Sequence, residues 1–165
     1  MLYLQIKTWT GLEAVLQKEV EKAVLHAGET IKQVLIDSVN RMWYSEHTPE
    51  KYKRTMGVLK SITLESLKQG KNGSSARIYF DETKILSRES DGWNQHMSLD
   101  GSDSWKGEKI SVLIPLWMDQ GQTSRVFPYK GSEFFTVTEE YAQDEAIFLI
   151  DEALKKAGFS SVVVG

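Results

Sequence analysis

The side chains that most often carry catalysis or bind metals are sparse in this chain, and their spacing fits no established reaction centre. There is no cysteine, and the three histidines are His26, His47 and His96. Zinc sites use Cys, His and carboxylate ligands at short characteristic spacings, such as two His one helical turn apart. No two of these histidines have such a spacing, and the absence of cysteine excludes a thiol nucleophile. We therefore expect no catalytic residue, no bound metal and no cofactor.

Two polar stretches resemble ligand-binding loops only superficially. Asp91, Asp100 and Asp103 offer carboxylate oxygens, but they lack the residue order and the distal glutamate of an EF-hand. Residues 70–74 contain Gly, Lys and Ser, but no helix is predicted to follow them, as a phosphate-binding loop requires. His96 lies among Ser and Asp residues, which leaves a loop-borne hydrolase as a minor alternative.

Length and composition set the class of protein that must position these residues. The chain has 165 residues, of which 41% are hydrophobic and 26% are charged. A chain of this length buries roughly 70% of its unfolded surface, so it can build a core without disulfides or a structural metal. No apolar run approaches the length of a membrane span, and residues 1–9 contain no secretory signal. These features predict one soluble domain over residues 1–165.

The small net charge of −3 conceals an uneven distribution of charge along the chain. Residues 49–77 contain seven basic and two acidic side chains, whereas residues 133–165 contain seven acidic and two basic ones. A segment of net charge +5 and one of −5 would suit complementary contacts between copies of the chain. Two solvated faces of a monomer would explain the same pattern.

The N-terminal part of the chain predicts one long amphipathic helix over residues 10–45. Thr10 and Glu13 have the spacing of a capping box, which would start the helix. Apolar residues then recur at steps of three and four: Leu12, Val15, Leu16, Val20, Ala23, Val24, Ala27, Ile31, Val34, Leu35, Val39 and Met42. About 30 residues at roughly 1.5 Å per residue would span about 45 Å, unless Gly28 breaks or bends the helix. Either the helix wraps its own sheet, or part of this stripe needs a partner outside its own domain.

The middle of the chain, residues 58–137, predicts a β-sheet region. Residues 61–67 and 76–80 are rich in β-forming side chains and flank a polar stretch containing Asn72 and Gly73, which predicts a hairpin with a long tip. Residues 87–107 are polar, contain glycine and show no period, so we expect a long loop of the kind that is usually functional or disordered.

Two further apolar stretches predict the remaining strands. The run at residues 110–118 is nearly continuous in apolar side chains and predicts a buried strand, bent at Pro115 because proline cannot donate to a ladder. Residues 134–137 predict a short strand that precedes the last helix.

The C-terminal part predicts a helix over residues 139–158 with Gly158 as its C-terminal cap. The apolar run at residues 146–150 covers every direction around such a helix, so we expect burial on more than one side. The elements do not alternate as strand and helix. The predicted fold is therefore α+β, with a long N-terminal helix, a small and mostly antiparallel sheet carrying a long loop, and a C-terminal helix packed on the sheet.

A motif follows the long helix at residues 44–62, with the form Y-x(4)-P-x-x-Y-x-R-T-x-x-x-L-x-S-I. Together with the ending A-L-K-K-A-G-F at residues 153–159, this motif resembles the tail-completion or head–tail joining proteins of long-tailed bacteriophages and prophages. The order of predicted elements fits the resemblance over nearly the whole chain. One departure is that Met56 stands where a glycine often follows the R-T pair, so that Gly57 is displaced by one position.

The resemblance implies a non-enzymatic virion protein that completes the tail or joins it to the head. The working form would be a ring, expected to have sixfold symmetry, that contacts itself and the neck and tail-tube proteins. It would be found in the virion, and in the host cytoplasm during assembly. Nonspecific contact with DNA passing through the channel is compatible with this function.

Six residues are candidates for interface or structural roles: Tyr52, Arg54, Thr55, Leu59, Phe148 and Ile150. In this scheme Tyr52 packs at the corner between helix and sheet, Arg54 satisfies buried carbonyl groups or a carboxylate, and Thr55 caps a helix. Ordinary core packing within a monomer is the competing interpretation of these three. The alternative function is a small nucleic-acid-associated module that uses the basic segment at residues 51–77, although the chain has no DNA- or RNA-binding signature.

Overall fold

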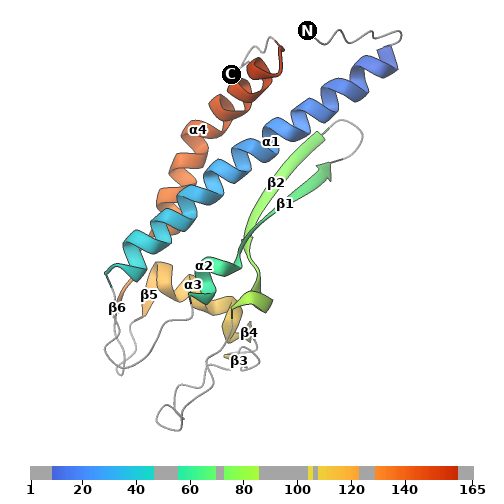
Figure 1. Cartoon of the computed structure of the whole chain (residues 1–165). Coiled ribbons are helices and arrows are strands. Elements are labelled where there is room, and N and C mark those ends of the chain that lie inside the picture. The colour runs from blue at the N-terminus through green and yellow to red at the C-terminus, as the bar shows by residue number, and fades with distance from the viewer. Residues whose placement is uncertain are drawn as a thin grey trace. The chain divides into compact units, whose positions relative to one another are not determined.

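The computed structural model confirms the α+β prediction. A long N-terminal helix is followed by a two-stranded antiparallel sheet and a C-terminal helix (Figure 1). The C-terminal helix packs through contacts with the N-terminal helix. The structure describes residues 9–46, 56–69, 73–85, 104–105, 108–122 and 129–159. The chain forms two compact units. Unit 1 comprises Met1–Ile31, Leu64–Arg77 and Tyr141–Gly165, and unit 2 comprises Lys32–Thr63 and Ile78–Glu140.

The first helix, α1 (Trp9–Val39), continues directly into a π-helical turn, η1 (Asn40–Tyr44), so the helical stretch covers nearly all of the predicted range. Two details differ from the prediction. Trp9 is already helical, so Thr10 lies inside the helix and is not its N-cap residue. Gly28 does not interrupt the helix: a Cβ atom there would lie only 2.9 Å from Leu64 Cδ1, so glycine lets the hairpin approach α1 closely within unit 1.

The predicted hairpin is present as β1 (Ile62–Gln69) and β2 (Gly73–Phe80). Its connection is shorter than predicted, because the strands leave only residues 70–72 between them. Between the middle parts of the two strands, Arg77 Nη2 lies 2.7 Å from Glu65 Oε2. A short helix, α2 (Gly57–Ser61), precedes β1.

The strand predicted at residues 110–118 is wrong, because this run forms helix α3 (Ile110–Gln120) with Pro115 inside it. A continuous apolar run does not by itself distinguish a buried strand from a buried helix, and its 11 residues suit a helix better than a strand. Before α3, β3 (Ser104–Trp105) pairs antiparallel with β4 (Glu108–Lys109), so the end of the predicted loop 87–107 contains a short strand. Residues 86–103 and 106–107 lie outside the described residues.

The strand predicted at residues 134–137 is also wrong, because helix α4 (Phe134–Lys156) begins there rather than at residue 139. A small antiparallel pair precedes it, β5 (Gly121–Gln122) with β6 (Tyr129–Lys130). Thr138 is buried within α4, and its hydroxyl donates to the Phe134 carbonyl at 2.8 Å.

The structure confirms that Gly158 caps the C-terminal end of the last helix. Gly158 has a φ of +89°, which L side chains rarely adopt. The Phe159 N–H donates to the Leu154 carbonyl and the Gly158 N–H to the Lys155 carbonyl, both at 3.0 Å. This pair of bonds is a Schellman motif, which satisfies carbonyl groups that the end of a helix leaves without partners.

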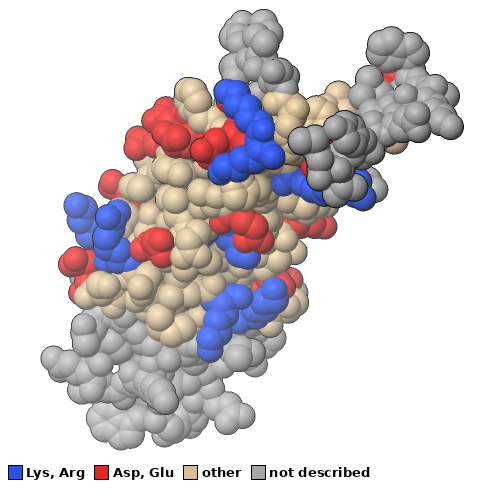
Figure 2. Space-filling model, turned by 45° about the horizontal axis from the view of Figure 1, so that its top comes forward, with Lys and Arg blue, Asp and Glu red and all other residues tan. Residues whose placement is uncertain are grey.

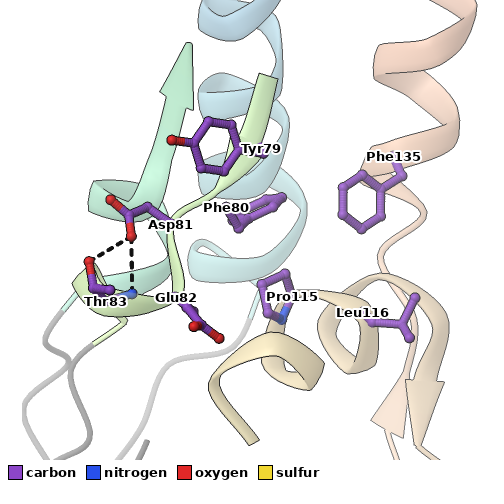
Figure 3. Close-up of a pocket in the computed structure, with 8 residues that line it drawn as sticks. All are labelled: Tyr79, Phe80, Asp81, Glu82, Thr83, Pro115, Leu116 and Phe135. Atoms are coloured by element: carbon purple, nitrogen blue, oxygen red, sulfur yellow. Dashed lines mark hydrogen bonds between the residues drawn. The ribbon is translucent and has the colours of Figure 1, made fainter. Parts of the chain in front are cut away.

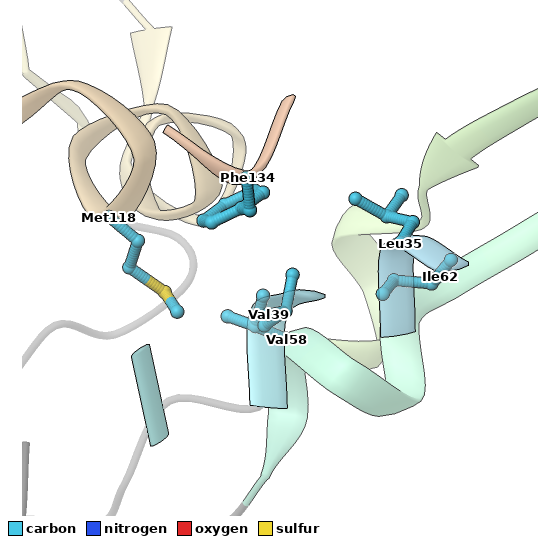
Figure 4. Close-up of a cluster of buried hydrophobic side chains, with 6 residues drawn as sticks. All are labelled: Leu35, Val39, Val58, Ile62, Met118 and Phe134. Carbon is cyan, nitrogen blue, oxygen red and sulfur yellow. The ribbon is translucent and has the colours of Figure 1, made fainter. Parts of the chain in front are cut away.

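The principal core lies in unit 2. Its buried side chains come from α1, α2, β1, α3 and the start of α4: Leu35, Val39, Val58, Ile62, Met118 and Phe134 (Figure 4). Val39 and Phe134 have no exposed surface at all. The Asp81 N–H donates to the Ser61 carbonyl at 2.8 Å, and Asp81 is the N-cap residue of a 3₁₀ turn, η2 (Glu82–Lys84).

Candidate interaction surfaces

The junction between α3 and α4 fixes the beginning of α4 within unit 2. Glu133 directly precedes the helix and has a φ of +55°, so it does not have the extended backbone of an ordinary N-cap residue. Asp119, at the end of α3, caps the helix instead: its Oδ1 accepts from the Phe135 N–H at 2.8 Å. In return, the Ser132 and Glu133 N–H groups donate to the carbonyls of Met118 and Asp119. The end of one helix and the start of the next therefore satisfy each other's backbone groups.

Gly131 permits this close junction. A Cβ atom at Gly131 would lie 2.2 Å from the Asp119 carbonyl oxygen and 2.6 Å from the Gly121 nitrogen. Both are backbone atoms, so no side-chain movement could relieve the overlap. Next to it, the Ser132 hydroxyl donates to the Met42 carbonyl at 3.0 Å, which ties the junction to the π-helical turn η1.

Burial raises the pKa of the Asp119 carboxyl above its usual value, and the negative charge of Glu133 acts in the same direction. The N–H groups of Phe135 and Phe134 lower the pKa of this carboxyl but do not reverse the shift. Asp119 serves to cap α4, and its raised pKa follows from that buried position.

An open, mainly apolar groove lies in unit 2 between the end of β2 and α3 (Figure 3). Its volume is about 620 Å³, and Phe80, Pro115, Leu116 and Phe135 supply its apolar lining. The ring of Phe80 meets that of Phe135 edge-on, with 5.6 Å between the ring centroids. The ring centroid of Phe135 lies 4.8 Å from that of Phe134, which is part of the core. The groove is therefore an exposed extension of the core, with a fixed aromatic floor.

The polar rim of the groove is engaged in local structure. Asp81 Oδ1 accepts from the Thr83 hydroxyl at 2.6 Å and from the Thr83 N–H at 3.1 Å, and Asp81 Oδ2 lies 3.2 Å from Lys84 Nζ. The bond from the Thr83 hydroxyl lowers the pKa of Asp81, with a further contribution from Lys84. These groups cap η2. The apolar lining of the groove can offer a contact to another apolar group.

The second surface is the solvent-facing side of α4 in unit 1. Phe148 is 65% exposed and Ile147 is 54% exposed. The expectation of burial on more than one side is therefore wrong, because Ile147 and Phe148 are exposed while Leu149 and Ile150 are half-buried. Two consecutive large apolar side chains in water leave an unfavourable hydration free energy that contact with another surface would remove.

Carboxylates surround Phe148 on the helix. Asp144 and Glu145 lie one turn before it, and Asp151 and Glu152 lie one turn after it. Asp151 and Glu152 pair with Lys155 and Lys156 at 2.6 and 3.4 Å.

Asp144 and Glu145 form no ion pair with any residue that the structure describes. We call the set Asp144, Glu145, Ile147 and Phe148 the α4 face. Figure 2 shows one face of the molecule, on which small groups of acidic and basic side chains lie between uncharged areas. The α4 face thus combines an exposed aromatic ring with unpaired negative charge.

The structure places only some of the predicted interface residues. Tyr52, Arg54 and Thr55 lie outside the described residues. Leu59 is half-buried and packs against the core of unit 2, which is a structural role. Phe148 is the candidate that the structure leaves most open to a partner.

The sequence-based reasoning missed Asp119 and Gly131, which together position α4. The two residues are 12 positions apart, and no local pattern links an aspartate at the end of one helix to the start of the next. The available signal was the Gly-Ser-Glu sequence at residues 131–133, which indicates a chain reversal directly before an aromatic pair.

In the part of the chain that the structure describes, no group of three or more His, Cys, Asp or Glu side chains could hold a metal ion. Likewise, none of the described helices is long and apolar enough to span a membrane. No family model, curated protein or solved structure matches this chain.

Proposed function

We propose that this chain is a non-enzymatic structural subunit of a long-tailed phage or prophage particle. In this proposal it completes the tail or joins the tail to the head, and it works as a ring at the neck, expected to have sixfold symmetry. The virion is then its final location, and the host cytoplasm is where it assembles. The motif at residues 44–62 and the ending at residues 153–159 suggest this class, and the α+β fold is compatible with it.

The single observation that carries the proposal is the exposure of Phe148 within the acidic α4 face. Burying one phenylalanine side chain contributes roughly 1.5–3 kcal/mol, and aromatic anchors of this kind often supply most of the energy of an interface. An assembly subunit gains that free energy when it meets its neighbour. A chain that works alone would gain nothing from leaving this ring in water.

The alternative, a nucleic-acid-associated module, rests on the basic segment at residues 51–77. The α4 face gives it no support, because its carboxylates would repel phosphate groups. The Arg77 side chain within that segment already pairs with Glu65 at 2.7 Å.

Inactivating the gene for this chain in the phage or prophage that carries it tests the proposal. The expected result is an accumulation of separate heads and tails, or of tails of abnormal length, seen by electron microscopy. A plasmid copy of the gene should restore complete particles, and antibody labelling should place the chain at the neck or the end of the tail. Normal yields of complete, infectious particles without the chain would contradict the proposal.

A further inference from the structure

We propose that the α4 face binds the segment Lys51–Arg54 of a second copy of the chain. This inference rests on the proposed function, because it names the contact by which subunits of the assembly would meet. The occupant is chosen on charge and side-chain chemistry. The segment reads Lys-Tyr-Lys-Arg, so that three of its four residues are cations and the fourth is an aromatic.

The charge of the two partners is complementary. Between residues 134 and 154, α4 carries six acidic side chains and no Lys or Arg. Asp144 and Glu145 on the α4 face have no ionic partner within the described residues, whereas the carboxylates after Phe148 are paired with lysines of the same helix. The unpaired end of the face is therefore the part that attracts a cationic segment from another chain.

The side-chain types are complementary as well. An Arg guanidinium or Lys ammonium group is attracted to the face of an aromatic ring, and Phe148 presents such a ring next to two carboxylates. A cation above that ring would also lie within reach of Asp144 or Glu145, where charge-assisted hydrogen bonds form. Tyr52 would add an aromatic contact to Phe148 or Ile147. A purely apolar partner would leave the carboxylates desolvated, and a polyanion would be repelled.

The two surfaces come from different parts of the chain, so the contact is heterologous. Each subunit has one acidic α4 face and one basic segment. Each contact joins the α4 face of one subunit to the basic segment of the next. Contacts of this type repeat from subunit to subunit and close into a ring when the rotation allows.

The test uses two charge-reversal variants of the full chain. The acceptor variant is D144K/E145K, and the donor variant is K51E/K53E/R54E. The matched control, E13K/E46K, reverses the same number of acidic charges at exposed positions of the helical stretch Trp9–Tyr44 and the turn after it. Sedimentation velocity over a range of protein concentrations at low salt measures self-association, and circular dichroism verifies that each variant is folded.

Wild type and the control should associate, and each reversal should lower the association constant at least about tenfold. An equimolar mixture of the acceptor and donor variants should associate more strongly than either variant alone. It joins an intact α4 face to an intact basic segment, and a reversed α4 face to a reversed segment. Combining both reversals in one chain should restore association. High salt should weaken association of the wild type.

Three results would overturn the inference: a wild type that remains monomeric at all concentrations, an acceptor variant that associates as well as wild type, or a mixture that associates no better than either variant alone. The first result includes the case in which the segment binds the α4 face of its own chain. None of these results bears on the gene-inactivation experiment, whose outcome decides the proposed function separately.

Discussion

Two pairs of consecutive large apolar residues lie on the same helix, α4, and the structure treats them in opposite ways. Phe134 and Phe135 open the helix in unit 2, where Phe134 is completely buried. Ile147 and Phe148 lie in the unit 1 part of the helix, where both are more than half exposed. The hydrophobicity of a side chain therefore does not by itself predict whether that side chain is buried in the core or exposed on the surface.

The neighbouring polar residues account for the difference. Next to Phe134 they are small groups that make specific local bonds, such as the Ser132 hydroxyl and the Asp119 carboxylate. Next to Phe148 they are four carboxylates, two of them one helical turn before it and two one turn after it. These charged groups need water or cations around them. An apolar pair framed by charges is more consistent with a contact surface than with a core.

The largest loss of stability should come from truncating Phe134, the buried phenylalanine of the two pairs. Phe134→Ala removes a ring with no exposed surface and leaves a cavity in the core of unit 2. We expect a loss of about 3–5 kcal/mol in the free energy of unfolding, measured by chemical denaturation. Phe148→Ala, the matched control, should cost less than about 0.5 kcal/mol. Equal losses for the two variants would remove the distinction between these sites.

The glycines near the two ends of α4 provide the next test. Gly131→Ala places a methyl group against backbone atoms of Asp119 and Gly121, so we expect a loss of about 3 kcal/mol or a shifted junction. At Gly158 nothing lies within 4 Å of an added Cβ, and only the positive φ opposes the substitution. Gly158→Ala should cost about 1 kcal/mol. Thermal denaturation of both variants measures the difference, and a Gly131 variant as stable as the Gly158 one would contradict the close junction.

Removing the cap of α4 should have a smaller effect. Asp119→Ala deletes the acceptor for the Phe135 N–H, and we expect a loss of about 1–2 kcal/mol at neutral pH. Asp119→Asn keeps an acceptor oxygen and loses the buried charge, so it should be the milder substitution.

The pH dependence of the same site follows from the raised pKa of Asp119. The folded state holds this proton more tightly than the unfolded chain, whose pKa is near the ordinary value of 3.8. The resulting stabilisation is complete below that pH and is lost as pH rises through the folded pKa. Denaturation between about pH 7 and pH 4 should show wild type gaining stability relative to Asp119→Asn as pH falls. A constant difference would show that the carboxyl is not desolvated.

The smallest effect on stability should come from the residue before α2. Like α4, this helix is preceded by a residue with a positive φ. Met56 has a φ of 57°, where a side chain costs about 1 kcal/mol or more. Met56→Gly should therefore be more stable than Met56→Ala by about 0.5–1 kcal/mol, the reverse of the order within a helix. The converse order, measured by thermal denaturation, would mean that Met56 is not strained. This position is the one where the motif at residues 44–62 departs from its usual glycine.

Local patterns predicted the elements that local forces determine. The stripe of α1, the hairpin strands and the Gly158 cap follow from periodicity, β-propensity and the conformational freedom of glycine. The α3 run was misread because a continuous apolar stretch has no period, so only its surroundings decide between strand and helix. The start of α4 was misread because its cap comes from Asp119, 16 residues before Phe135.

The candidate surface was predictable in part. The acidic character of the C-terminal segment and the choice of Phe148 were read directly from residue types. The exposure of Phe148 was not, because an unbroken apolar run favours burial on all sides, and only the placement of α4 in unit 1 shows which side chains remain in water.

The most direct test of the central claim, that the α4 face is a surface for association, compares Phe148→Asp with wild type. Both are examined by sedimentation velocity under conditions in which wild type associates, and by thermal denaturation. Leu16→Asp, at a side chain on α1 that is 43% exposed, is the matched control. We predict that Phe148→Asp melts within a few degrees of wild type and remains monomeric, while Leu16→Asp still associates. An unfolded Phe148→Asp variant, or a folded one that associates like wild type, would contradict it.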